Sequence, residues 1–82
     1  MSYTKELCNF AFKVGQPLSV VYFSGVNRFV VCIECVAVKD GYMRPRLQGK
    51  GTTIEDACYD YLRLARGANL VNLITDEKLE LI

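Results

Sequence analysis

Hydrophobic positions recur with a helical period in residues 4–14. The apolar residues follow the spacing i, i+3, i+4, i+7, and they are Leu7, Phe10, Ala11 and Val14. Ser2 or Thr4 can cap the start of this helix with a side-chain oxygen, and Gly15 is a typical stop. The pattern therefore predicts a first helix that buries one face.

A second helical period covers residues 53–66. Its apolar stripe consists of Ile54, Ala57, Cys58, Tyr61, Leu62 and Ala65. Thr52 and Glu55 match the capping box T-x-x-E at the start, and Gly67 follows the last turn. This segment is the clearest helix in the sequence.

β-branched and aromatic residues dominate the chain between the two helices, which predicts three strands. Their ranges are 18–24, 29–38 and 42–48. The pair Asp40-Gly41 favours a hairpin between the second and third strands. Pro45 cannot donate a backbone hydrogen bond, so the third strand is expected at an edge of the sheet.

The tail, residues 70–82, is ambiguous. A strand at 70–74 is preferred, a hairpin with 79–82 is an extension of that choice, and a final helical turn is the alternative. We therefore expect an α+β fold of order α-β-β-β-α, in which a three-stranded antiparallel sheet has two helices packed on one face. Residues 1–82 form a single domain in this prediction, with a core at 1–69 and a C-terminal extension at 70–82.

Composition limits the classes of protein to consider. The chain has 82 residues, 51% of them hydrophobic and 23% charged, which is typical of one small folded domain. It lacks an apolar run long enough for a membrane span and a signal-peptide pattern at the start, so a cytoplasmic location is expected. The net charge of +1 is lower than most nucleic-acid-binding domains have.

The four cysteines raise the question of metal or redox chemistry. They are Cys8, Cys32, Cys35 and Cys58, and the chain has no histidine. On a continuous strand, Cys32 and Cys35 point to opposite faces with Cα atoms about 10 Å apart, too far for a disulfide. Tetrahedral zinc needs four converging ligands, and a hydroxyl or thiol nucleophile lacks its usual histidine base. We expect reduced, mostly buried thiols, no metal, no cofactor and no enzymatic activity.

Alternation along 29–38 leaves the second face of that strand unusually apolar. This face consists of Val30, Cys32, Glu34, Val36 and Val38. Exposed apolar patches mark interaction surfaces, so these residues are a candidate protein-interaction face for another protein or for a homodimer. The alternative is that the C-terminal segment covers them.

A basic cluster follows on the predicted third strand and the loop after it. It consists of Tyr42, Arg44, Arg46 and Lys50. Cations beside an aromatic ring can contact phosphates, which makes these residues a candidate nucleic-acid or anion contact. The alternative is a solvated strand edge that charge protects from pairing.

The α-β-β-β-α order with the entry Gly-Lys-Gly-Thr-Thr at 49–53 resembles the double-stranded-RNA-binding domain over residues 4–66. That family opens its last helix with a basic K-K-x-A-K stretch, whereas 54–57 is Ile-Glu-Asp-Ala. Its first loop carries a proline and a histidine, which 24–28 lacks. The resemblance implies the fold, with nucleic-acid binding through the basic third strand as the alternative function.

Residues 49–71 also look like the C-terminal half of small phage and prophage proteins. The shared pattern is G-x-G-x-T-x-E-E-A-x-x-D-Y-L, followed by R-G and L-V. A related pattern occurs in HicB-type antitoxins. This resemblance implies a phage-derived accessory or regulatory protein in the host cytoplasm. The expected function is a non-enzymatic protein-interaction module that binds a host or phage protein.

Overall fold

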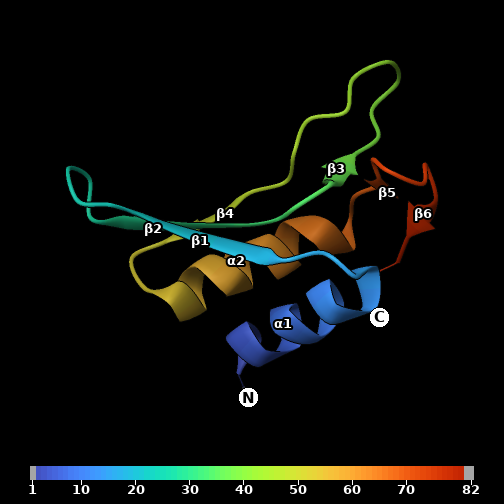
Figure 1. The fold of residues 1–82 in the computed structure, drawn as a ribbon. Coiled ribbons are helices and arrows are strands. Elements are labelled where there is room, and N and C mark those ends of the chain that lie inside the picture. Colours follow the sequence, from blue (N-terminus) through green and yellow to red (C-terminus); the bar gives the residue numbers. More distant parts are fainter. Residues whose placement is uncertain (1, 81–82) are drawn as a thin grey trace.

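The computed structural model describes residues 2–80, and within them the chain forms two helices and two three-stranded antiparallel sheets (Figure 1). The elements in order are α1 (Tyr3–Val14), β1 (Leu18–Phe23), β2 (Arg28–Ile33), β3 (Val36–Val38), β4 (Gly49–Gly51), α2 (Ile54–Arg66), β5 (Leu70–Asn72) and β6 (Lys78–Leu79). The first sheet has the order β1-β2-β4 and the second has the order β3-β5-β6. The predicted α+β class is confirmed.

Helix α1 follows its sequence pattern closely. The Ser2 hydroxyl accepts a hydrogen bond from the Lys5 N–H at 3.2 Å, so Ser2 is the cap rather than Thr4. Gly15 adopts the left-handed conformation with φ 81° and donates its N–H to the Ala11 carbonyl, which ends the helix. Leu7, Phe10 and Ala11 are buried against the rest of the core.

Helix α2 begins one residue later than the predicted capping box requires. Thr53 is the cap, because its hydroxyl accepts the Asp56 N–H at 3.0 Å. Glu55 serves the other helix instead: its carboxylate accepts the N–H groups of Tyr3 and Thr4 at 3.0 and 2.8 Å. Within residues 2–80, no helix has the length and apolar character needed to cross a membrane.

The first sheet is packed against the helices through one face. β2 is central, as predicted, and its residues Val31 and Ile33 are buried. The β1–β2 hairpin keeps one register from Leu18 opposite Ile33 to Phe23 opposite Arg28. Figure 1 shows α1 and α2 on the same side of this sheet.

The predicted continuous strand over 29–38 is wrong. The chain turns at Glu34 and Cys35, and Cys35 has a left-handed φ of 63°. As a result β2 and β3 belong to different sheets. The sequence has no glycine, proline or asparagine at this point to indicate the break.

The predicted third strand over 42–48 is also wrong. This segment makes isolated bridges between Ala37 and Arg46 and between Asp40 and Met43, and it extends away from the helices (Figure 1). β4 takes the third place in the first sheet instead. The hairpin turn predicted from Asp40-Gly41 is confirmed, with Gly41 at φ 61°.

The C-terminal segment forms the predicted strand and hairpin. β5 pairs with β3 and with β6, and Leu70 and Val71 are buried. The prediction extended this hairpin to residue 82, and residues 81 and 82 lie outside the described part of the chain. Since β5 and β6 pair with β3, they add to the core without covering the second face of the first sheet.

Candidate interaction surface

The face of the first sheet that points away from the helices is hollowed into a groove. Side chains alternate along a strand, so Val30 and Cys32 point away from the buried face of β2. Directly opposite residues share a face, which places Val21 of β1 and Lys50 of β4 beside Val30. The groove has a volume of about 520 Å³, and its lining residues are Val21, Phe23, Val26, Arg28, Val30, Cys32, Gln48 and Lys50.

Apolar side chains form the floor of this groove. Val21 is 49% exposed, Phe23 is 51% exposed, and Val26 in the β1–β2 turn is 67% exposed. Val30 and Cys32 are half-buried between them. An exposed apolar patch of this kind is a candidate interaction surface.

Two cations border the groove. Arg28 lies opposite Phe23 at the hairpin end, and Lys50 lies opposite Val30 on β4. Neither cation forms an ion pair with any residue between 2 and 80. The groove therefore combines an apolar floor with positive charge that is free to meet an anion.

The structure places two of the five predicted face residues in the groove. Val30 and Cys32 line it, whereas Val36 is fully buried in the core and Val38 packs against the core. Glu34 lies in the turn and accepts hydrogen bonds from the Ser19 hydroxyl and from Arg46. The break at 34–35 moves β3 into the second sheet, which is why the predicted face divides.

Sequence reasoning missed the groove residues that β1, the β1–β2 turn and the first position of β2 contribute. Val21, Phe23, Val26 and Arg28 were not among the predicted site residues, and they form half of the groove lining. The alternation Ser19, Val21, Phe23 along β1 could have indicated them. Their place beside Val30 and Cys32 depends on the hairpin register, which the sequence does not specify.

The cysteines are free thiols, and only Cys58 is buried, so the prediction of mostly buried thiols is wrong. Burial raises the pKa of the Cys32 thiol, and the nearby Glu34 charge raises that pKa further. Cys35 lies in the turn after β2 rather than on a strand. Cys32 is thus a protonated, weakly nucleophilic thiol at neutral pH.

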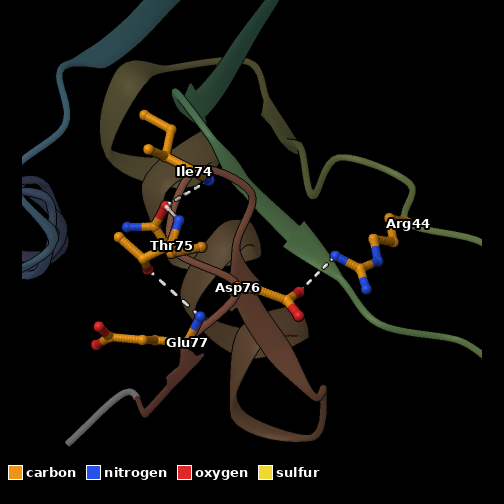
Figure 2. A network of polar contacts seen from close by, with 6 residues as sticks. Arg44, Ile74, Thr75, Asp76 and Glu77 are labelled. Atoms are coloured by element: carbon orange, nitrogen blue, oxygen red, sulfur yellow. Dashed lines mark hydrogen bonds and ion pairs between the residues drawn. The ribbon is translucent and has the colours of Figure 1, made fainter.

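The predicted basic cluster does not form one cationic strip. The Arg44 guanidinium pairs with the Asp76 carboxylate at 2.6 Å (Figure 2), and Arg46 pairs with Glu34 at 3.3 Å. Tyr42 is fully exposed at the Asp40–Met43 hairpin, away from any strand. Lys50 alone of the four lines the groove.

The loop that holds Asp76 is organised by backbone hydrogen bonds to side chains. The carboxamide oxygen of the buried Asn72 accepts the N–H of Ile74 at 2.9 Å and that of Thr75 at 3.4 Å. The Thr75 hydroxyl accepts the Glu77 N–H at 3.3 Å (Figure 2). This arrangement positions Asp76 to neutralise the charge of Arg44.

Asp60 connects α2 to β4. Its carboxylate accepts the Lys50 N–H at 3.0 Å and the Arg63 guanidinium at 2.6 Å. Desolvation acts to raise the pKa of Asp60, but these hydrogen bonds and the two positive charges outweigh it and lower the pKa. These contacts leave the Lys50 side chain available at the groove.

Among residues 2–80, no group of three or more His, Cys, Asp and Glu side chains is placed to share a metal ion. No protein-family model, curated protein or solved structure matches this chain. The inference of function therefore depends on the groove and on the charges around it.

Proposed function

We propose that this chain is a non-enzymatic protein-interaction module and that the groove is its binding surface. The observation that supports the proposal most directly is an exposed apolar floor bordered by Arg28 and Lys50, two cations that form no ion pair within residues 2–80. The partner is a protein segment that presents large apolar side chains together with aspartate or glutamate. Binding would bury the apolar floor and pair both cations.

The dimensions of the groove support this kind of partner. Its volume of about 520 Å³ is large enough for a few apolar or aromatic anchors. Such anchors dominate the free energy of binding in most interfaces, while polar contacts at the rim exclude water. Phe23 and Val30 line the groove and provide apolar area for an anchor to contact.

The charges support an acidic partner. Arg28 and Lys50 give the groove a positive potential, which would speed encounter with an anionic segment and disfavour a basic one. Other arginines are already neutralised, since Arg44 and Arg46 pair with carboxylates of this chain. Free positive charge on the sheet is therefore concentrated where the apolar floor lies.

The biological setting in this proposal is a phage-derived accessory or regulatory protein that binds a host or phage protein in the cytoplasm. Its support is the resemblance of residues 49–71 to small phage and prophage proteins. In the structure these residues include β4, α2 and the start of β5, so the resemblance covers the helix that supports the groove from beneath.

Selection of peptides from a random display library tests the proposal. Enriched peptides are expected to combine large apolar residues with Asp or Glu. Val26→Asp should weaken their binding by at least about tenfold, through lost apolar contact and repulsion of the acidic partner. The matched control is Ile74→Asp, because Ile74 is also 67% exposed but lies in the β5–β6 loop. Equal binding by Val26→Asp and wild type would refute the groove as the binding surface.

A parallel measurement tests the alternative function, which is nucleic-acid binding. Duplex RNA and duplex DNA are titrated at two salt concentrations against the wild type and against Arg44→Glu combined with Arg46→Glu. We expect weak binding that the double variant does not change, because both arginines are paired within the chain. Micromolar, salt-sensitive binding that the double variant abolishes would favour a nucleic-acid-binding domain instead.

A further inference from the structure

Strand β1 has an unoccupied edge. It is the outer strand of the order β1-β2-β4 and pairs with β2 on one side. In the described part of the chain, no strand and no backbone hydrogen bond lies on its other side. Every second residue of β1 therefore directs its N–H and C=O groups outward.

Natural edge strands are usually protected against pairing by charge, proline, bulges or short length. β1 has none of these features: its six residues, Leu-Ser-Val-Val-Tyr-Phe, include no charged residue and no proline. It keeps an unbroken register with β2 along its whole length. The opposite edge of the sheet is β4, which has only three residues.

We infer that β1 pairs antiparallel with β1 of a second copy of this chain, which joins the two first sheets into one of six strands. Charge favours a second copy as the occupant. β1 is neutral, so two copies meet without repulsion along the contact. Arg28 lies opposite Phe23 at one end of β1, so a two-fold axis places the two Arg28 residues at opposite ends of the contact.

Geometry also restricts the register of this pairing. Directly opposite residues of an antiparallel pair share a face, so a continuous sheet requires partners whose numbers have the same parity. A two-fold axis at Val21 pairs Val21 with Val21, Val20 with Tyr22 and Ser19 with Phe23. This register includes the four most exposed residues of β1, which are Val20, Val21, Tyr22 and Phe23 at 44–51% exposure. Leu18, which is half-buried and packs against the core, stays outside it.

The pairing has a consequence for the groove. Val21 and Phe23 line the groove from the β1 edge. A two-fold axis perpendicular to the sheet keeps both open faces on one side and all four helices on the other. The two grooves then meet at the β1–β1 contact and form one longer surface with Lys50 towards each outer edge. The dimer goes beyond the proposed function, since peptide binding to a monomer would satisfy the latter alone.

Light scattering and sedimentation equilibrium test the dimer. The wild type is expected at twice the monomer mass at submillimolar concentration. Val21→Lys should weaken dimerisation at least tenfold, because two lysines would face each other across the axis. Val26→Lys is the matched control: it places the same charge in the groove lining but away from β1, so the dimer should persist. A monomeric wild type, or equal dimerisation by Val21→Lys, would overturn the inference.

A disulfide test examines the register independently. Opposite residues in an antiparallel pair have Cα atoms about 4.5–5.5 Å apart, within the range for a disulfide. Under mild oxidation Val21→Cys should give a covalent dimer on a non-reducing gel, while the wild type with its four native thiols and Val26→Cys should not. Equal cross-linking of Val26→Cys would contradict the register. A failed dimer together with groove-dependent peptide binding would leave the proposed function intact.

Discussion

At the scale of single residues, Cys35 decides the topology of the chain. Its φ of 63° lies in the left-handed region, which costs a non-glycine residue roughly 1–2 kcal/mol. The carbonyl of Cys35 accepts the Leu73 N–H at 2.7 Å, so the turn is held by the C-terminal loop. This contact between distant segments explains why a local sequence pattern favouring a strand does not prevail.

Replacement of Cys35 by valine tests whether this residue lies in a turn or in a continuous strand. A β-branched residue would suit a strand, but it is strongly disfavoured at positive φ. We therefore expect Cys35→Val to lower the free energy of unfolding by about 1 kcal/mol in urea titrations. Cys32→Val in the regular part of β2 is the control and should change it by less than about 0.5 kcal/mol. A stabilising Cys35→Val would contradict the turn.

Glu55 makes stability depend on pH through its contacts with α1. Hydrogen bonds from the Thr4 N–H, the Thr4 hydroxyl and the Tyr3 N–H lower the pKa of its carboxyl below the ordinary 4.5. A lowered folded-state pKa means that the stabilisation is present above the unfolded pKa and is lost as the pH falls through the folded value. The dependence should therefore be confined to acid.

Glu55→Gln tests this linkage. The carboxamide has one acceptor oxygen, so the variant should unfold at lower urea concentration than wild type near neutral pH. The difference should shrink as the pH falls through the lowered folded-state pKa of Glu55, because the wild-type carboxyl is then also protonated. Glu77→Gln is a suitable control, because the Glu77 carboxylate forms no hydrogen bond or ion pair with residues 2–80. A pH-independent difference would exclude the proposed contribution of charge.

At the scale of elements, β4 and α2 pack backbone to backbone. A Cβ atom on Gly49 would lie 2.7 Å from the Tyr61 Cβ, and one on Gly51 would lie 2.5 Å from the Ala57 N. Neither neighbour can move without displacing the helix. These glycines therefore set the distance between the sheet and α2.

Gly49→Ala should lower the free energy of unfolding by about 2–3 kcal/mol, because the added methyl group forces β4 and α2 apart. Gly25→Ala is the matched control, since a Cβ there meets nothing within 4 Å. It should be neutral or stabilise the chain by up to about 1 kcal/mol through the unfolded state. Chemical denaturation of both variants compares them directly. Equal effects of the two alanines would mean that close packing at β4 contributes little.

The glycines of β4 also illustrate which kinds of element the sequence could predict and which it could not. Both helices and β1 were predicted well, since their hydrophobic periods span several turns or alternations. The segment 49–51 contains two glycines, which usually interrupt a strand. It forms a strand here because α2 packs closely against it. Residues 42–48 have strand-like alternation but find no continuous partner. Local pattern identifies elements, whereas tertiary contacts select among weak ones.

The candidate site was predictable in part for a related reason. The alternation of β2 correctly indicated that Val30 and Cys32 point away from the core. The β1 side of the groove did not follow from local pattern, because it depends on the register of the β1–β2 pair. The pairing of the arginines did not follow either, because Arg44 and Arg46 pair with Asp76 and Glu34, which are distant in sequence.

At the scale of the whole molecule, the second sheet connects the middle of the chain with its end. β3 comes directly after the turn at 34–35, and β5 pairs with it from Val36 opposite Asn72 to Val38 opposite Leu70. Leu70 and Val36 belong to the same buried cluster as Leu62 of α2. The two sheets therefore share a core, and the segment predicted as an extension takes part in it.

Removal of residues 70–82 should consequently prevent cooperative folding. Burial of Leu70 and Val71 stabilises the chain by about 1.5–3 kcal/mol each, and β3 would also lose its partner strand. A domain of this size has only about 4–12 kcal/mol of stability in total. We expect a chain ending at residue 69 to lack a sigmoidal thermal transition by circular dichroism. A chain ending at Glu80 keeps β5 and β6 and should retain the transition, because every described strand pair is still present. Cooperative unfolding of the shorter chain at the wild-type temperature would show that the second sheet is dispensable for the core.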